Sequence, residues 1–342
     1  MVFNKIESNR YDIDLLKPFQ NSKIKFLQRT GNVIQLFLDE ECGCGEAAPL
    51  YPYSEESLSQ LSWSFEELKI ALKNNENYTK NDLLNLFELY AKHIPSLHFA
   101  LDLSLYDILA QKEKISLSKY LNPNSLAEVK LSSIYNGEVN QSFNTIKIKF
   151  GLQEIEKEVN LLYNLSKQYG DETRFRIDAN QIYSIDDFLY LVDRLKNFNI
   201  QYIEEPLAEL NMSNLEKIKE KCEIPLAIDE SIFQKNYKEF IENGLIEYAV
   251  IKPSLYGGVK AIFTLCDYLK KHNIKIILSS SLHTRIGNLA NIHLASALEL
   301  PGFHGLNNYA FYQFDRNKIP YGRDDSRVKI DHLNGLGVRV ND

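Results

Sequence analysis

One unit recurs along the chain from about residue 131 onward: a short apolar strand, a turn, and then a helical pattern. Strands that alternate with helices run parallel, because each helix carries the chain back to the start of the next strand. Eight such strands predict an α/β fold, a (β/α)8-type barrel or modified TIM barrel. The predicted strands span residues 131–137, 145–150, 175–180, 200–206, 226–231, 247–253, 274–281 and 302–307.

Helical patterns lie between most of these strands. The sequence SNLE at 213–216 has the form of a capping box and predicts the start of one helix there. The connection between the first two strands is too short to hold a full helix. Two apolar stripes at helical spacing support the assignment, Ile155–Val159–Leu162–Tyr169 and Phe188–Leu191–Val192–Leu195.

The first 120 residues follow a different pattern. Apolar runs at 24–27 and 33–38 flank QRTGN (28–32), which predicts a hairpin. Three helical patterns follow, over 57–74, 83–94 and 95–112. We therefore expect an α+β capping domain over 1–120, a barrel domain over 121–320, and a C-terminal segment over 321–342 that returns to the cap.

Composition and charge narrow the classes of partner. The formal net charge of −7 disfavours binding to nucleic acid or to an anionic membrane surface. The N-terminal residues MVFNKIESNRYDIDLL lack the apolar core of a signal peptide, and no stretch approaches the roughly 20 apolar residues of a membrane span. We expect a cytoplasmic protein that acts on a small molecule; the sequence does not give its oligomeric state.

The four cysteines do not suggest a disulfide framework. Cys42 and Cys44 are too close in sequence for an ordinary disulfide, and Cys222 and Cys266 lie in helical patterns. A Cys-x-Cys metal site would need further ligands, which are not apparent nearby. Buried thiols in a reducing compartment are the better interpretation.

Charged residues cluster near the ends of the predicted strands. In this fold the C-terminal ends of the strands form the mouth of the barrel, where active sites lie. Lys147 and Lys149 are two residues apart, so their side chains share one face of a strand. If Ile203 and Ile228 face the helices, then Glu204 and Asp229, rather than Glu205 and Glu230, face the interior. The remaining charged residues in this set are Asp178 and Lys252.

Three consecutive strands thus offer one inward carboxylate each. Converging oxygen ligands suit a hard cation such as Mg²⁺, with Mn²⁺ as a substitute. Salt bridges between neighbouring strands are the alternative, and Glu204 with Asp229 could instead form a glycosidase pair. Neither alternative accounts for charges at five successive strand ends.

The lysines then acquire a chemical role. A second ammonium group two residues away and a nearby divalent cation both lower the pKa of a lysine. A neutral amine beside a metal-bound carboxylate can remove the proton α to that carboxylate, and the cation stabilises the enediolate. The sequence therefore predicts an acid–base lysine and a neighbour that tunes it.

These motifs resemble those of a known family. TIKIKF, RIDAN, YIEEP, AIDES, VIKPSLYGG and SSSLHT are similar, in order and spacing, to the muconate-lactonizing subgroup of the enolase superfamily, and most of all to its o-succinylbenzoate synthases. GCGEAAPLYPYS (43–54) resembles the cap signature of the same superfamily, although an aromatic residue usually stands at the position of Cys44. The resemblance covers nearly the whole chain.

The resemblance implies roles for individual residues. Asp178, Glu204 and Asp229 match the metal ligands, Lys149 matches the acid–base lysine, and Lys147 matches its partner. Lys252 matches the lysine on the opposite face of the substrate, where it would stabilise the enediolate. Two further positions match the same motifs: Arg176, which either binds substrate or braces the ligand carboxylates, and Asn180, which would orient a ligand.

Three features bear on the substrate. Ser279 and Ser281 could hold a substrate carboxylate, or they could simply end a strand. Subgroup members that act on dipeptides carry an Asp-x-Asp near the eighth strand, and GLNNYAFYQ (305–313) has none. Phe19, Tyr51 and Tyr53 lie in the cap stretches that close over the mouth in this superfamily, although aromatic residues there could equally serve packing.

The resemblance implies dehydration of 2-succinyl-6-hydroxy-2,4-cyclohexadiene-1-carboxylate to 2-succinylbenzoate, a hydro-lyase reaction of menaquinone biosynthesis. Alternatives within the same chemistry are an N-succinylamino acid racemase, a dipeptide epimerase and a cycloisomerase. A barrel that has lost catalysis and only binds ligand is a further alternative, and the intact set of charged residues disfavours it.

Overall fold

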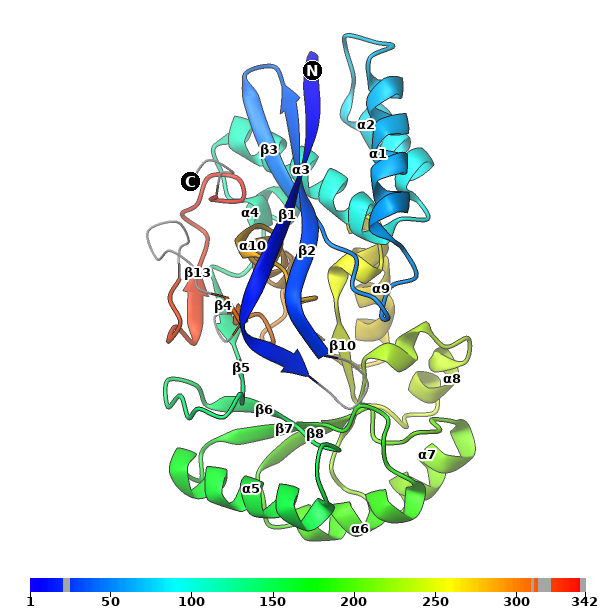
Figure 1. Cartoon of the computed structure of the whole chain (residues 1–342), viewed down its shortest axis with the longest axis vertical. Coiled ribbons are helices and arrows are strands. Elements are labelled where there is room, and N and C mark those ends of the chain that lie inside the picture. The colour runs from blue at the N-terminus through cyan, green and yellow to red at the C-terminus, as the bar shows by residue number, and fades with distance from the viewer. Residues whose placement is uncertain (21–24, 309–310, 313–320, 339–342) are drawn as a thin grey trace.

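A three-stranded antiparallel sheet and three helices form the N-terminal part of the computed structural model, which describes residues 1–20, 25–308, 311–312 and 321–338 (Figure 1). Strand β2 (Lys25–Leu38) lies between β1 (Phe3–Gln20) and β3 (Glu41–Ala47). The long β1 and β2 reach down over the barrel, so residues far from the sheet's core stand above the barrel mouth.

The predicted hairpin at residues 28–32 is wrong. Strand β2 runs straight through this segment, and Gly31 pairs with Tyr11 on β1. A Cβ atom at Gly31 would lie 2.4 Å from Tyr11 Oη and 2.8 Å from Ala48 Cβ. The glycine is therefore required by close packing against two neighbours, and composition alone does not distinguish this role from that of a turn.

The three predicted helices of the cap are present as α1 (Leu58–Leu72), α2 (Lys80–Ala91) and α3 (Pro95–Glu113). Ser57 and Thr79 each form a capping box with the residue three positions on, which satisfies backbone N–H groups at the first turn. Helix α3 begins with a proline at its first position, where the missing N–H costs nothing.

Helix α3 is buried on nearly all sides and belongs to two hydrophobic clusters. Leu97, Leu101 and Leu105 pack in the cluster of the cap, with α1, α2 and β2. Phe99 and Leu103 pack in the cluster that surrounds the barrel strands. The helix is thus a wall that the cap and the barrel share.

The backbone of strand β3 packs directly against the backbone of α3. A Cβ atom at Gly43 would lie 1.9 Å from the carbonyl oxygen of Ser104, and one at Gly45 would lie 2.0 Å from that of Ala100. Because the two glycines are two residues apart, they present one smooth face of the strand to the helix.

The barrel strands form a parallel sheet that curls on itself. Within the described residues the order is β11-β10-β9-β8-β7-β6-β5, seven strands in all. Helices α5 to α9 cover its outer side (Figure 1). The elements are β4 (Glu128–Leu131), β5 (Ser133–Ile134), β6 (Thr145–Lys149), α5 (Ile155–Tyr169), β7 (Arg174–Asp178), α6 (Ile185–Leu195), β8 (Ile200–Glu204), α7 (Met212–Lys219), β9 (Leu226–Ile228), α8 (Tyr237–Glu242), β10 (Tyr248–Ile251), α9 (Val259–Lys271), β11 (Lys275–Leu278), α10 (Arg285–Ala297) and β12 (Phe303–His304).

Strand β12 closes the ring. It pairs in parallel with β4, which leads directly into β5, and Ser279 and Gly305 form a parallel bridge between the extensions of β11 and β12. The Gly305 N–H donates to the Leu278 carbonyl at 2.8 Å, and the Ser132 N–H donates to that of His304 at 2.8 Å. The predicted (β/α)-barrel with an N-terminal cap is confirmed.

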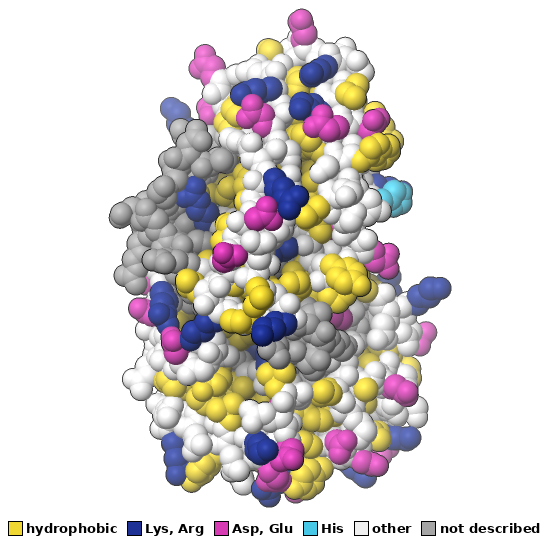
Figure 2. Space-filling view, viewed as in Figure 1, with side chains coloured by type: hydrophobic (Ala, Val, Ile, Leu, Met, Phe, Trp, Pro, Cys, Tyr) yellow, Lys and Arg dark blue, Asp and Glu magenta, His cyan; other side chains and the backbone are white. Residues whose placement is uncertain are grey.

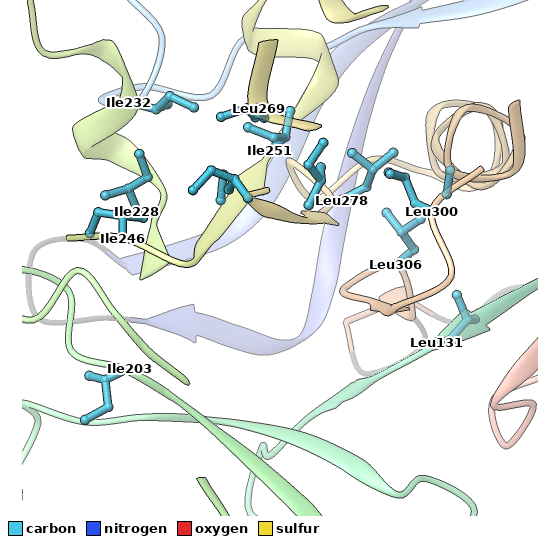
Figure 3. Packing of buried hydrophobic residues seen from close by; sticks show 14 of the residues in the cluster. Leu131, Ile203, Ile228, Ile232, Ile246, Ile251, Leu269, Leu278, Leu300 and Leu306 are labelled. Carbon is cyan, nitrogen blue, oxygen red and sulfur yellow. The ribbon is translucent and has the colours of Figure 1, made fainter. Parts of the chain in front are cut away.

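Alternation along the strands separates two cores. Ile203, Ile228, Ile251 and Leu278 face outward and pack against the helices (Figure 3). A small inner cluster is formed by their neighbours in sequence together with Tyr248: Tyr202, Ala227, Tyr248, Val250 and Ile277. This is the parity that the sequence predicts, so the residue two positions after each inner residue also points into the barrel.

Two details at the edges of the barrel differ from, or add to, the prediction. The box at 213–216 does not open α7: the helix starts at Met212, and the Asn211 side chain accepts from the Asn214 N–H at 3.0 Å. Asparagine is as good an N-cap as serine, so the cap residue is ambiguous in sequence.

Strand β13 (Arg327–Lys329) pairs antiparallel with β4, and the Leu336 N–H donates to Asp107 on α3 at 2.7 Å.

The domain boundaries remain predictions. The predicted boundary between 320 and 321 lies next to residues 313–320, outside the described part of the chain, as do residues 339–342 at the C-terminal end.

A buried carboxylate joins the cap to the barrel. Glu46, at the end of β3, accepts hydrogen bonds from the Thr284 N–H (2.9 Å), the Thr284 hydroxyl (2.6 Å) and the Gly287 N–H (2.9 Å) at the start of α10. The Tyr11 hydroxyl donates to the same group. A carboxylate at a helix N-terminus is favourable, and here the N-terminal sheet provides it to a helix of the barrel.

None of the described helices is both long enough and apolar enough to cross a bilayer. On the face shown in Figure 2, Lys and Arg side chains are interspersed with Asp and Glu.

The contact between β3 and α3 gives a prediction for stability. Gly45→Ala should lower the free energy of unfolding by about 3 kcal/mol, because the new methyl group overlaps the Ala100 carbonyl and one backbone must move. Urea denaturation followed by circular dichroism measures this. The control is Gly302→Ala, where the nearest atom is the end of the Ile277 side chain at 3.2 Å. Similar losses for both variants would contradict the prediction.

Candidate active site

Successive strand ends bring the predicted charged residues to one mouth. In the parallel ladders, Lys149 on β6 pairs with Asp178 on β7, and Asp178 pairs with Glu204 on β8. Asp229 and Lys252 each follow directly after a strand, β9 and β10. Asp178, Glu204 and Asp229 are 4%, 1% and 6% exposed, so three carboxylates are nearly removed from water within one region.

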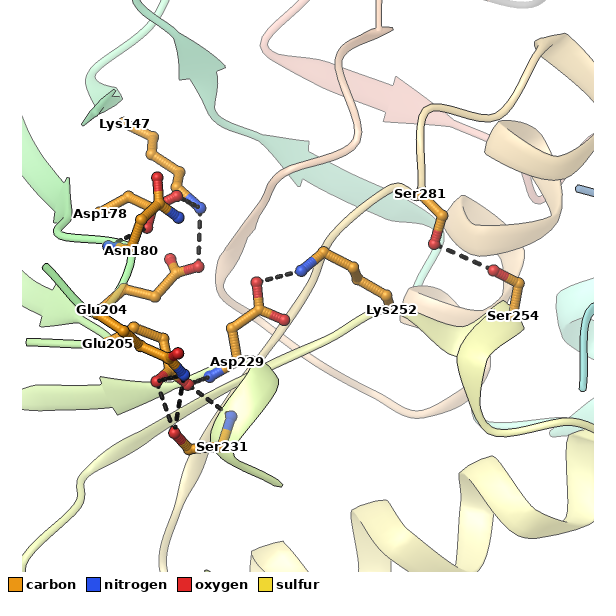
Figure 4. Close-up of polar contacts among 11 residues, drawn as sticks. Lys147, Asp178, Asn180, Glu204, Glu205, Asp229, Ser231, Lys252, Ser254 and Ser281 are labelled. Carbon is orange, nitrogen blue, oxygen red and sulfur yellow. Dashed lines mark hydrogen bonds and ion pairs between the residues drawn. The ribbon is translucent and has the colours of Figure 1, made fainter. Parts of the chain in front are cut away.

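One lysine lies between two of these carboxylates. Lys147 Nζ is 2.8 Å from Asp178 Oδ2 and 2.8 Å from Glu204 Oε1 (Figure 4). Burial alone would lower the pKa of Lys147, but the two carboxylates raise it well above its ordinary value. This lysine therefore stays an ammonium ion and supplies positive charge.

A second lysine stands on the other side of the carboxylates. Lys252 Nζ forms an ion pair with Asp229 Oδ2 (Figure 4) and lies 5.2 Å from the centre of the Tyr53 ring of the cap. Although burial lowers the pKa of Lys252, the charges of Asp229 and Glu230 raise it above its ordinary value. Lys252 is thus also an ammonium ion in this arrangement.

Lys149 differs from both. Burial lowers its pKa to about 8, and the neighbouring ammonium groups of Lys147 and Lys252 act in the same direction. Its Nζ lies 3.6 Å from the centre of the Phe19 ring. Strands β6 and β10 are four positions apart in the ring, so Lys149 and Lys252 face each other across the mouth.

Glu205 fixes the backbone around Asp229 by hydrogen bonds, a role that the sequence did not predict. Its carboxylate accepts from the Asp229 N–H (2.7 Å), the Ser231 N–H (2.8 Å), the Ser231 hydroxyl (2.6 Å) and the Gln181 amide (2.8 Å), as Figure 4 shows for Ser231 and Asp229. Glu205 has φ +49°, so the strand turns there and directs this side chain away from the interior. The signal is the pair Glu204–Glu205 itself, because alternation sends one carboxylate into the barrel and the other behind it.

The arrangement of these side chains bears on metal binding. Among the described residues, no three His, Cys, Asp or Glu side chains stand close enough together to hold a metal as they are. Instead, Lys147 bridges Asp178 and Glu204, and Lys252 forms an ion pair with Asp229. The chemistry of the donors nevertheless fits a hard cation. Glu204 Oε2 is buried without a hydrogen-bond partner, and burial raises the pKa of Glu204 well above its usual range.

Two other predicted residues lie at the floor and edge. Arg176 is buried, and its guanidinium donates to Gln201 (2.8 Å), Ser132 (3.2 Å) and the Phe303 carbonyl (2.7 Å). It lines the floor of the cavity and links β7 to the two strands that close the ring. The Asn180 N–H donates to Asp178 Oδ1 at 3.2 Å, and Asn180 Oδ1 is buried without a partner.

The three serines after β11 have different positions. Ser279 and Ser280 line the cavity. The Ser280 hydroxyl accepts from Asn308 Nδ2 (2.8 Å) and the His283 N–H (3.1 Å), so it is held in place. Ser281 is not among the described residues of the lining; it is fully buried and shares a hydrogen bond of 3.1 Å with Ser254 (Figure 4).

Apolar side chains from both the cap and the barrel cover the cavity. Phe19, Tyr53 and Phe311 line the cavity together with Leu50 and Leu282. Tyr51 is 78% exposed and is not one of the described lining residues, whereas Tyr53 is one of them. The structure thus brings Phe19, Arg176 and Ser279 to the cavity, and it leaves Tyr51 and Ser281 outside.

This geometry can perform a defined kind of chemistry. Two lysines of different basicity face one another across a set of carboxylates, and aromatic side chains cover the space between them. Such a site can move a proton at a carbon atom and stabilise the negative charge that results.

Comparison with known proteins places the chain among enzymes. It is 26% identical to the L-Ala-D/L-Glu epimerase of Francisella tularensis subsp. novicida over 284 residues, which cover 78% of this chain and 79% of that protein. It is 23% identical to the o-succinylbenzoate synthase of Listeria innocua, over 99% of this chain and 94% of that protein.

The fold agrees with solved structures. The dipeptide epimerase from Enterococcus faecalis, complexed with Mg and the dipeptide L-Leu-L-Tyr, superposes with a TM-score of 0.86 at 19% identity, covering 99% of both chains. The family model described as enolase C-terminal domain-like matches residues 135–342. The chain therefore belongs to the enolase C-terminal domain-like family and is an enzyme of the enolase superfamily.

Proposed function

We propose that the chain is a Mg²⁺-dependent o-succinylbenzoate synthase, which dehydrates 2-succinyl-6-hydroxy-2,4-cyclohexadiene-1-carboxylate to 2-succinylbenzoate. The observation that carries the proposal is the opposition of Lys149 and Lys252 across the carboxylates, in a cavity whose eighth-strand end bears amides. The similarity to a synthase over nearly its full length supports it.

The substrate class follows from the lining. A cavity with Lys147, Lys149, Lys252 and Arg176 in its walls suits a carboxylate, and its apolar roof suits a hydrocarbon ring. Asn307 and Asn308 line the cavity, and the stretch 305–313 to which they belong has no Asp-x-Asp of the kind that would hold the ammonium group of a dipeptide. Because asparagine side chains are neutral, this end of the cavity disfavours a buried ammonium group.

Asp178, Glu204 and Asp229 would hold Mg²⁺, or Mn²⁺ in its place, with Asn180 orienting Asp178. The cation would supply a Lewis acid for the substrate carboxylate. The ammonium groups of Lys147 and Lys252 would then be released from these carboxylates and would face the substrate.

The proton transfers belong to the lysines. Lys149 takes the proton α to the carboxylate, and the ammonium groups of Lys147 and Lys252 stabilise the enediolate. Lys149 then returns its proton to the departing hydroxyl group on the same face, so that the elimination is syn and water leaves. Arg176 and Ser279 would bind carboxylate or carbonyl oxygens of the substrate, and Phe19 would cover the ring.

Racemisation of N-succinylamino acids is the second candidate. The observation that favours it is the same pair of lysines, because racemisation needs an acid–base group on each face of the α-carbon. Dipeptide epimerases and cycloisomerases share the chemistry. Because one similar protein is an L-Ala-D/L-Glu epimerase, dipeptide epimerisation should be tested as well. Assays of all four reactions with one purified preparation test the proposal. Absence of dehydration alongside racemisation, epimerisation or cycloisomerisation would overturn it.

The metal gives the first prediction for this site. Removal of divalent ions with EDTA should abolish dehydration, and added Mg²⁺ should restore it. Asp229→Asn should bind Mn²⁺ at least tenfold more weakly by calorimetry, because one carboxylate ligand is lost, while its circular dichroism spectrum stays unchanged. Full activity after exhaustive chelation would exclude the three-carboxylate site.

The second prediction concerns the acid–base lysine. Lys149→Ala should lower kcat for dehydration by roughly 10³-fold or more, because general acid–base catalysis contributes roughly 10²–10⁴-fold and one group serves both steps. Lys271→Ala, the same change on the exposed side of α9, is the control and should leave kcat unchanged. Near-wild-type turnover in the Lys149 variant would assign the base elsewhere.

The third prediction separates the synthase from the racemase. Lys252→Arg keeps a cation that does not deprotonate at neutral pH. It should abolish exchange of the α-proton of N-succinylamino acids from the Lys252 face and leave measurable dehydration. Proton exchange in D₂O, followed by NMR for each enantiomer, measures both. A variant that loses dehydration yet exchanges both enantiomers would refute the two roles.

A further inference from the structure

Two cysteines stand side by side on the strand that joins the cap to the barrel. Cys42 and Cys44 lie on β3, whose ladder with β2 is regular, with Phe37 opposite Cys42 and Gln35 opposite Cys44. Side chains two apart on a strand share a face. The glycines at 43 and 45 take the opposite face against α3, so both thiols point away from that helix backbone.

The two thiols are in contact and are chemically unlike. Cys42 is half-buried, whereas Cys44 is only 2% exposed. The Cys44 thiol hydrogen-bonds to the sulfur of Cys42 and lowers the pKa of Cys42 to about 7, against the effect of burial. The Gln35 amide donates to the same sulfur at 3.7 Å. Cys42 is therefore the sulfur that more readily becomes a thiolate.

The other two cysteines provide an internal comparison. Cys222 and Cys266 are buried separately, and all four cysteines are thiols. Burial raises the pKa of Cys222, and it raises that of Cys266 to about 12. Neither has a second thiol as a neighbour in sequence, so neither has a partner two residues away on a strand.

We propose that Cys42 and Cys44 are a peroxide-reactive dithiol that closes to a reversible disulfide within one strand. The Cys42 thiolate attacks one oxygen of a hydroperoxide; the O–O bond breaks, giving Cys42 sulfenic acid and hydroxide or alkoxide. The Cys44 thiol then attacks the sulfenic sulfur, the S–S bond forms, and water leaves. Two electrons pass from the thiols to the peroxide, and no other reactant is needed.

The geometry makes such a disulfide feasible and easily reduced. Two residues of a strand span about 6.6 Å between Cα atoms, which lies near the upper end of the range for disulfides, about 4.4–6.8 Å. Gly43 between the cysteines carries no side chain to resist the bend. Its backbone is nevertheless pressed against Ser104, so contraction of the strand costs energy. A strained disulfide is a stronger oxidant than a relaxed one, so mild thiols should reverse it.

The test treats the full-length protein with hydrogen peroxide. We expect two of the four thiols to be lost on titration under denaturing conditions, with a loss of two hydrogen atoms from the intact mass and no dimer on a non-reducing gel. Peptide mapping should place the bond between residues 42 and 44, and dithiothreitol should restore all four thiols.

Variants assign the order of attack. Cys44→Ser should leave a sulfenic acid on Cys42 that dimedone traps, and Cys42→Ser should slow thiol loss at least tenfold. Cys266→Ser is the control and should react like the natural chain. Thiol loss that maps to Cys222 or Cys266, or disulfides between molecules, would overturn the proposal. Mapping of the natural chain decides this even if a variant does not fold.

Discussion

The burial of several carboxylates in one cavity is the constraint on which the rest of this structure depends. Asp178, Glu204 and Asp229 cannot all be charged at low dielectric unless cations compensate them. Lys147 and Lys252 supply two positive charges, and Glu204 keeps one oxygen without a partner. The parallel barrel is the device that makes the arrangement possible, because each strand delivers one charge to the same mouth and its outward neighbours hold the strand in place.

Much of this arrangement could be predicted from the sequence, because the period of two along a strand is rigid. Once Ile203 and Ile228 face outward, Glu204 and Asp229 have no choice of side. The prediction fails where a residue type has two uses. Gly31 serves close packing instead of a turn, and Asn211 caps α7 in place of the serine two residues later.

The parts that sequence did not reveal depend on rotation within loops and on contacts between distant segments. Tyr51 and Tyr53 are the same residue type two positions apart, and only the folded structure shows which of them lines the cavity. The same holds for Ser280 and Ser281 beyond the end of β11, where Asn308 holds one hydroxyl and Ser254 the other. Alternation no longer applies after a strand has ended, so parity gives no guidance there.

Helix α3 has a consequence for how proteins of this shape can be recombined. Its Leu97 and Leu101 belong to the cap cluster, its Phe99 and Leu103 to the barrel cluster, and its Asp107 holds both β3 and the C-terminal segment. A cap transplanted from another barrel would therefore bring half of a foreign interior with it. Exchange of caps between such enzymes should succeed only when the residues on both faces of α3 match their new surroundings. The segment that can be exchanged is therefore larger than the cap alone.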